Sequence, residues 1–281
     1  MIQLMNAGAV LNQGIEIELN VDVFRGKDFN WSISGNYSHN TNEVKKLAKD
    51  PTGKDIEITT STKITKVGES IGTWNMRKWA GVDPTNGLPL WYVNGIAGET
   101  TSVYNKAKVA MQGKSAPVYS GGFGTHIDYK GVYLDVSFYL AGGHKVYEDW
   151  AAYTQSTGDY TFVAFNGTEN LMDRWQNPGD VASTPKMELG SGRNAASTST
   201  RFLYDGDYIR MKDLVLGYRF SPETVKFMSL AGLDMSVRGT NLLTFVKDGK
   251  MKYDPEVRAD GFTSLVSPPV KSVVFAINLK L

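Results

Sequence analysis

Apolar and polar side chains alternate along most of the chain, which is the pattern of β-strands that have two different faces. In residues 15–23 every odd position is Ile, Leu or Val and every even position is Glu, Asn or Asp. Residues 132–140 alternate in the same way. Together with weaker runs elsewhere, this pattern predicts an all-β protein, an antiparallel meander of about nine long strands. The further runs lie at 30–38, 63–82, 88–93, 117–129, 206–220, 233–245 and 273–281.

Two stretches depart from clean alternation. Leu214 and Leu216 share one phase, whereas Ile209 and Met211 fall on the other. Either a β-bulge near Lys212 shifts the phase, or the upper part of this strand stands above the apolar zone. Residues 63–93 predict a less regular pair of strands joined by a turn at 83–87.

The lengths of the connections indicate which solvent the apolar face meets. A soluble β-sandwich also has one apolar face, but it has no physical reason to place a long loop at every second connection. Outer-membrane barrels do so, with short periplasmic turns, long extracellular loops and strands of about 9–11 residues. The pattern therefore predicts that the apolar face meets lipid and the polar face meets a watery lumen. Short links at 25–28, 83–87, 129–131 and 221–232 alternate with long ones at 41–62, 94–116, 142–202 and 246–269.

Composition narrows the function classes. The 281 residues include 41% hydrophobic ones, enough to bury a core, but no run of 18 apolar residues that would form a transmembrane helix. The net charge of +1 provides no basic field, so a nucleic-acid partner is not expected. Cysteine is absent, which removes disulfides, thiolate nucleophiles and Cys-based zinc sites.

The sequence provides little catalytic chemistry. His39, His126 and His144 lie far apart, without metal-ligand spacing, and His126 beside Asp128 is interpreted as a solvated lumen side chain. The carboxylates at 16 and 18 have no apolar pocket that would raise a pKa, so they are interpreted as pore-lining charge. The glycines of "GGFG" at 121–124 are assigned to close strand packing. We therefore predict no enzyme activity, no metal and no cofactor.

The long segment 142–202 carries aromatic residues among Asn, Asp, Gln and Ser, a mixture suited to stacking on sugar rings and binding hydroxyls. The candidate substrate-binding residues are Trp150, Tyr153, Tyr160 and Trp175. The alternative is that these aromatic side chains pin the loop to its own neighbours.

Several segments, in this order, resemble the C-terminal barrel portion of the SusC/RagA family of TonB-linked outer-membrane transporters. The likeness extends from about Asn6 to Leu281, and it lies in the ordered series rather than in any one motif. The segments are "NAGAVLNQGIEIELNV", "FNWSISGNYSHNTNEV", "WAGVDPTNGLPLW", "GGFGTHIDYKGVYLDVSFYLAGG", "DYIRMKDLVLGYRFS", "VRGTNLLTF" and "YDPEV".

The resemblance implies a role and a set of partners. Residues 1–281 would be the C-terminal segment of a barrel of about 22 strands in the outer membrane, in contact with lipid. The parent would import oligosaccharides or peptides captured with a SusD-like surface lipoprotein, driven by the TonB complex. No signal peptide, TonB box or plug domain is recognisable here, so the fragment is expected to be inactive alone, because open sheet edges are not tolerated in lipid.

A second hypothesis is a soluble all-β carbohydrate-binding or adhesive module. The aromatic loop residues are compatible with it, and it predicts an apolar face that closes over a dry interior.

Overall fold

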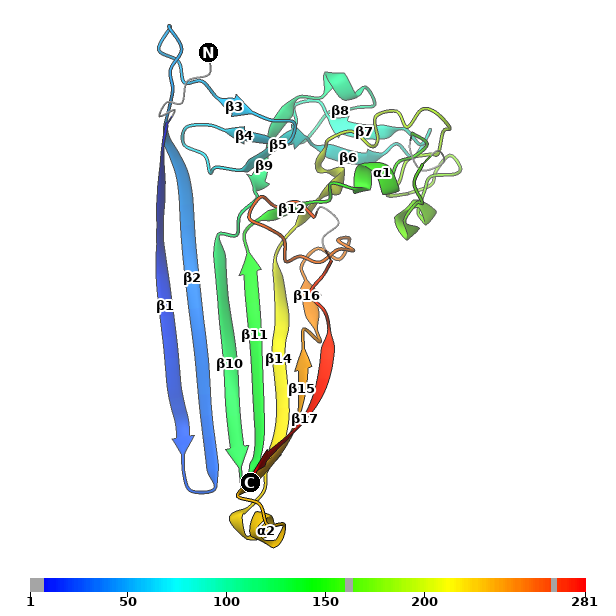
Figure 1. Ribbon diagram of the computed structural model, residues 1–281. Coiled ribbons are helices and arrows are strands. Elements are labelled where there is room, and N and C mark those ends of the chain that lie inside the picture. Colours follow the sequence, from blue (N-terminus) through cyan, green and yellow to red (C-terminus); the bar gives the residue numbers. More distant parts are fainter. Residues whose placement is uncertain (1–7, 160–163, 264–266) are drawn as a thin grey trace.

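Most of the strand residues lie in one large antiparallel sheet (Figure 1). The computed structural model describes residues 8–159, 164–263 and 267–281. The sheet order is β1-β2-β10-β11-β14-β15-β17, and the short β16 extends it by pairing with β14. These strands are β1 Gly8–Arg25, β2 Phe29–Leu47, β10 Tyr119–Tyr129, β11 Val132–Gly142, β14 Tyr208–Arg219, β15 Gly232–Thr240, β16 Thr244–Val246 and β17 Ser272–Lys280.

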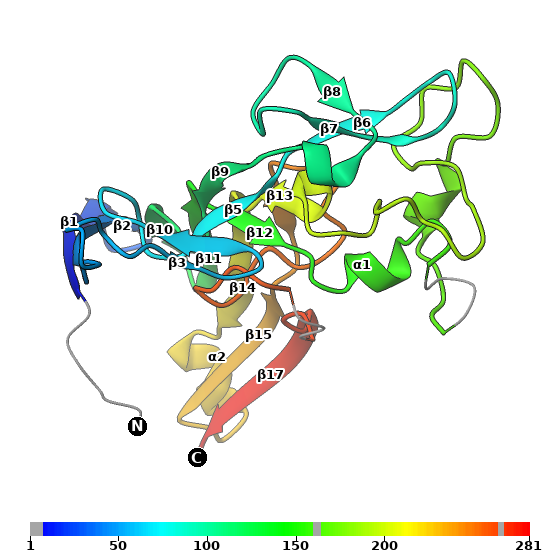
Figure 2. The ribbon, with the colours of Figure 1, turned by 90° about the horizontal axis from the view of Figure 1, so that it is seen from above.

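All neighbouring strands of this sheet are antiparallel, and each pairs with the next long strand along the chain. Seen from above, the strands follow a curved line from β1 to β17 (Figure 2). The predicted all-β antiparallel meander is therefore confirmed.

Within the described residues the large sheet has eight strands, and because β16 continues β15 the meander has seven passes rather than the predicted nine or so. The two strands predicted within 63–93 belong instead to small sheets above the meander. They are too short to cross a bilayer, and Trp74 and Trp91 are completely buried in them, pointing into a core. The turn at 83–87 thus joins two of these short strands. The small sheets contain β3 Ile58–Thr59, β4 Lys63–Thr65, β5 Thr73–Arg77 and β9 Val109–Lys114; β6 Trp79–Val82, β7 Pro89–Tyr92 and β8 Thr100–Thr101; and β12 Lys145–Tyr147 with β13 Leu203–Asp205.

Helices are few and short. They are the 3-10 turns η1 Tyr104–Lys106, η2 Glu169–Met172 and η3 Thr200–Phe202, with the α-helices α1 Ala151–Thr154 and α2 Pro222–Phe227. The start of α2 is encoded locally, because the Ser221 hydroxyl accepts from the Thr224 amide and proline occupies the first turn. In the part of the chain that is described, no helix has the length and apolar character needed to cross a membrane.

A β-bulge at Lys212 resolves the phase conflict seen in the sequence. Ser137 pairs with Asp213 and Phe138 pairs with Met211, so Lys212 is the extra residue on β14. The bulge brings the apolar side chains above and below it onto one face. The first of the two explanations offered by the sequence is confirmed.

Short and long connections alternate between the two ends of the sheet (Figure 1), as predicted, except that the predicted short link at 83–87 lies within the long 48–118 connection. Turns at 26–28 and 130–131 and the 220–231 link that carries α2 form one end, which we call the short-turn rim. The opposite end, the loop rim, carries 48–118, 143–207 and 247–271. We call 48–118 and 143–207 the loop layer.

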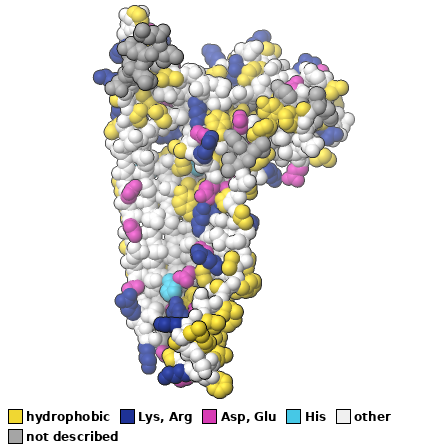
Figure 3. All heavy atoms as spheres, in the orientation of Figure 1, with side chains coloured by type: hydrophobic (Ala, Val, Ile, Leu, Met, Phe, Trp, Pro, Cys, Tyr) yellow, Lys and Arg dark blue, Asp and Glu magenta, His cyan; other side chains and the backbone are white. Residues whose placement is uncertain are grey.

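The sheet has one apolar and one polar face. On β1, Ile15 and Ile17 remain 64% and 59% exposed, and on β17 Phe275 remains 78% exposed. The opposite face is mostly polar, with scattered acidic, basic and histidine side chains (Figure 3). The predicted alternation is confirmed, and its apolar side is uncovered by protein rather than folded over a dry interior.

Aromatic side chains cluster near the short-turn rim. The ring centroids of Phe24 and Phe29 are 5.5 Å apart, and those of Phe29 and Tyr129 are 6.4 Å apart. Tyr133, by contrast, points to the polar face, where its ring covers Gly217 and a Cβ on that glycine would lie 2.2 Å from the ring. Aromatic rings gathered at one end of the strands, among them the amphipathic ring of Tyr129, form the arrangement expected at a membrane interface.

Candidate functional site

The polar face of the sheet is lined by cross-strand ion pairs. Each lies between neighbouring strands or one strand apart, so the charges are compensated within the wall itself. The sequence placed His126 beside Asp128, but alternation puts both on one face and each finds its partner on another strand. The ion pairs are Arg219 with Asp128 at 2.5 Å and Arg238 with Asp213 at 2.7 Å. His126 Nδ1 lies within hydrogen-bonding distance, 2.6 Å, of a carboxylate oxygen of Asp135.

Glycines hollow this face between β2, β10 and β11. Gly122 and Gly124 of the "GGFG" stretch present no side chain there, and they line a groove of about 360 Å³ together with Glu18 and Asn36. On the other face a Cβ at Gly121 would lie 2.5 Å from the Asn36 carbonyl oxygen, so the predicted close packing of strands is confirmed. A polar groove of this kind is consistent with the polar interior of a barrel wall.

The loop layer has its own hydrophobic core. Trp74, Tyr147 and Phe202 are almost completely buried, and Phe262 of the 247–271 segment packs against them. The Trp74 ring lies 5.1 Å from that of Phe262 and 5.7 Å from that of Tyr147. The long loops are thus held in place by packing rather than left structureless.

A buried carboxylate lies within this layer. Glu148 is 1% exposed and accepts hydrogen bonds of 3.1 Å from the Gln155 amide and from the Tyr204 hydroxyl. Burial raises the pKa of Glu148 above its ordinary 4.5, although hydrogen bonds from Tyr253 and Tyr204 oppose the shift. Nearby, burial lowers the pKa of Arg201 to about 10.

The raised pKa of Glu148 predicts a pH dependence of loop-layer stability. The folded state binds the proton more tightly than the unfolded state does, so the stabilisation is complete below pH 4.5 and is lost as the pH rises through the folded pKa. We expect hydrogen exchange of residues 143–157 to speed up over that window, after correction for intrinsic exchange. Glu148→Gln should flatten this dependence; an unchanged slope in the variant would assign it to another group.

A cleft of about 650 Å³ opens at the surface of the loop layer. Tyr104 and Tyr153 contribute aromatic surface to it, and Asp159, Arg193 and Asn194 contribute polar groups. Consecutive Arg193 and Asn194 both adopt positive φ, 49° and 63°, a conformation that costs free energy for residues with a side chain. The cleft therefore combines aromatic and polar surface.

The structure brings two of the four predicted aromatic residues together. The ring centroids of Trp150 and Tyr153 are 5.2 Å apart, and Phe165 joins them at 6.1 Å and 5.2 Å respectively. Of this cluster, Tyr153 also lines the cleft. Tyr160 lies outside the described residues. The assignment of these residues to substrate stays a prediction.

Trp175 is placed elsewhere, against the turn between β6 and β7. Its Nε1 donates to the Pro84 carbonyl oxygen at 3.0 Å, and a Cβ at Gly87 would lie 2.4 Å from its ring. Gly87 has φ of 73°, which suits glycine. In this position the side chain ties one loop to another, which is the alternative that the sequence left open.

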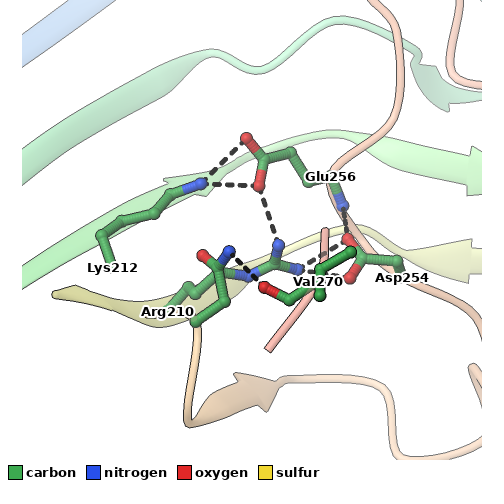
Figure 4. A network of polar contacts seen from close by, with 6 residues as sticks. Arg210, Lys212, Asp254, Glu256 and Val270 are labelled. Carbon is green, nitrogen blue, oxygen red and sulfur yellow. Dashed lines mark hydrogen bonds and ion pairs between the residues drawn. The ribbon is translucent and has the colours of Figure 1, made fainter. Parts of the chain in front are cut away.

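Sequence reasoning missed a charged cluster at the loop rim (Figure 4). Arg210 on β14 is 1% exposed, and its Nη2 contacts both carboxylate oxygens of Asp254 at 2.6 Å. Its Nη1 donates to Glu256 at 2.9 Å, and Glu256 also accepts from Lys212 at 2.7 Å. We call these four residues the clamp. The available signal was an arginine in a strand together with the acidic "YDPEV" motif, whose pairing depends on the tertiary fold.

The clamp belongs to a longer connection between the sheet and the loop layer. Beyond Asp254 and Glu256, the 247–271 segment continues to Gly261, whose carbonyl oxygen accepts from the Tyr147 amide at 2.8 Å. Gly261 has φ of 76°, and a Cβ there would lie 2.8 Å from the Trp74 ring. The segment thus ties β14 to the core of the loop layer. No group of three or more His, Asp or Glu side chains in the described part of the chain is arranged to hold a metal ion.

A curved antiparallel sheet with an uncovered apolar face, an ion-paired polar face and all long loops at one rim is a portion of a transmembrane β-barrel. No family model matches the chain. It is 24% identical to TonB-dependent receptor P39 of Formosa agariphila, over 98% of this chain and 31% of that protein. It is 23% identical to TonB-dependent receptor SusC of Bacteroides thetaiotaomicron, over 98% of this chain and 27% of that protein.

Solved structures with a similar fold point to the same kind of protein as these relatives. The RagAB peptide transporter matches with a TM-score of 0.79 and 26% identity, over 98% of this chain and 30% of the matched chain. The open-open state of the RagAB peptide importer matches with a TM-score of 0.78 and 25% identity. The resemblance to SusC/RagA-type TonB-linked transporters is confirmed over nearly the whole chain. The chain spans about three-tenths of the length of the relatives it matches.

Proposed function

We propose that the chain is the C-terminal barrel segment of an outer-membrane TonB-dependent importer of glycans or other nutrients such as peptides. The uncovered apolar face of the large sheet carries the proposal, because a soluble protein seldom leaves so large an apolar surface in water. The polar face would form part of the lumen wall, and the loop layer would meet the substrate at the outer surface.

The partners follow from this role. A SusD-like surface lipoprotein would lie over the loop rim, the apolar face would contact outer-membrane lipid, and the TonB complex would act through parts of the importer other than these strands. We propose no catalytic activity for this segment of the importer. The match to the RagAB peptide transporter supports a peptide substrate, and glycans stay within the proposal through the resemblance to SusC/RagA-type transporters.

Fractionation of cells that express the complete gene product containing this chain tests the proposal. We expect the product in the outer-membrane fraction, resistant to extraction with high salt and carbonate and released by detergent. A product that stays in the soluble fraction would exclude the importer. The alternative, a soluble carbohydrate-binding or adhesive module, requires refolding of the 281-residue chain without detergent into a monodisperse particle.

A further inference from the structure

A cavity of about 510 Å³ lies beside the clamp, between β14, the break that separates β15 from β16, and the residues just before β17. Arg210, Asn241 and Asp254 contribute polar groups to its wall, and Lys271 contributes a cation. Pro269 and Val270 add apolar surface. The cavity is large enough for one or two sugar or amino-acid units.

Two residues of this wall each have one buried polar atom without a hydrogen-bond partner. Nε of Arg210 is an unsatisfied donor, although both terminal nitrogens of the same guanidinium are bound to Asp254 and Glu256. Oδ1 of Asn241 is an unsatisfied acceptor, while its Nδ2 donates to the Val270 carbonyl oxygen at 3.1 Å. Leaving a buried donor and acceptor unpaired costs free energy, which a bound group would recover.

The charges around the cavity favour an anion. The clamp is neutral, since the cations of Arg210 and Lys212 are balanced by the carboxylates of Asp254 and Glu256. Lys271 is a further cation, and within the described residues it has no carboxylate partner. One negative group in the cavity would therefore compensate the remaining charge and accept from Nε of Arg210.

We propose that this cavity binds a carboxylate group of the imported substrate, an inference that rests on the proposed importer function. Arg210 Nε and the Lys271 ammonium donate to the carboxylate, and Asn241 Oδ1 accepts from a neighbouring hydroxyl or amide of the same ligand. The apolar wall at Pro269 and Val270 covers the uncharged part. An acidic peptide and a uronic-acid oligosaccharide share this chemistry.

The test compares charged and uncharged probes on the complete gene product in detergent at low salt. One pair of probes is triglutamate and triglutamine peptide, and the other is tri-galacturonate and its methyl ester. We expect the charged member of one pair to bind more tightly than its uncharged counterpart, and that pair identifies the source. Lys271→Gln should weaken this binding about tenfold, as one lost partly desolvated charge pair does.

Lys226→Gln is the matched control, because it removes the same charge from α2 at the opposite rim. It should leave the affinity unchanged. Equal affinity for charged and uncharged probes, equal weakening by both variants, or no binding of either charged probe at millimolar concentration would each overturn the proposal. An outer-membrane product with any of these results retains the importer and loses only the carboxylate site, whereas a soluble product loses both.

Discussion

Replacing Arg210 by methionine is expected to release the 247–271 segment from the sheet. The guanidinium is 1% exposed and contacts two carboxylates, so its removal leaves the side chain of Asp254, 21% exposed, without a cationic partner and with only the Glu256 amide, among the described residues, as a hydrogen-bond donor. Removing one member of a buried ion pair costs about 3–5 kcal/mol, because the remaining charge is poorly solvated. Hydrogen exchange of residues 247–263 measures this as a fall in the protection of their amides.

Arg238→Met is the matched control for this prediction. Arg238 also lies on the polar face and pairs with a single carboxylate, that of Asp213, but its side chain is 60% exposed. Water replaces an exposed partner at little cost, so we expect protection of the 247–271 segment to remain as in the parent. Equal loss of protection in the two variants would mean that the clamp does not hold the segment.

Replacing Val136 by lysine is expected to impair insertion of the protein into a bilayer. Val136 lies on the apolar face near the middle of β11, a strand that is paired on both sides. A lysine on the lipid face at the bilayer midplane costs about 2–4 kcal/mol. Folding of the complete gene product into lipid vesicles, followed by the heat-dependent shift in gel mobility, reports the folded fraction.

Ser137→Lys is the matched control, because it introduces the same charge at the next residue of β11. Ser137 faces the polar side, where it borders the groove that contains Gly124. A lysine there meets water, so folding into vesicles should proceed as in the parent. If Ser137→Lys impaired folding as much as Val136→Lys does, the two faces would not differ in solvent and the barrel assignment would be wrong.

The strands of the sheet could be predicted because every second side chain of a strand points to the same face and so meets the same environment. The alternation in 15–23 and 132–140 fixed both the existence of the strands and the face that is apolar. The break in alternation around Lys212 was also informative, because it marked the position of a β-bulge. The sequence could not choose between the bulge and a raised strand end, because that choice depends on the register with β11.

The short strands within 63–93 were misassigned for a related reason. Alternating apolar residues such as Trp74 and Trp91 look alike whether they face lipid or a small protein core. Strand length separates the two cases, and in this region the boundaries are set by packing of the loop layer. Local pattern carries no information about that packing.

The candidate site was even harder to predict from the sequence than the short strands. Aromatic residues in a loop can either bind a substrate or pack against residues of their own loop, and composition does not distinguish these two roles. Trp150 and Tyr153 pack together, whereas Trp175 donates a hydrogen bond to Pro84, 91 residues earlier in the chain. The clamp joins Arg210 to residues 44 and 46 positions further along, without any local signature.

The sequence by itself determined the class of structure: long antiparallel strands with one apolar and one polar face, and long loops at one end. These features follow from periodicity and spacing, which are local properties of the chain. Only the tertiary structure decided which segments form strands of the large sheet, where the bulge lies, and how residues 247–271 connect β14 to the loop layer. Those outcomes depend on contacts between distant residues, where burial and charge compensation outweigh local preference.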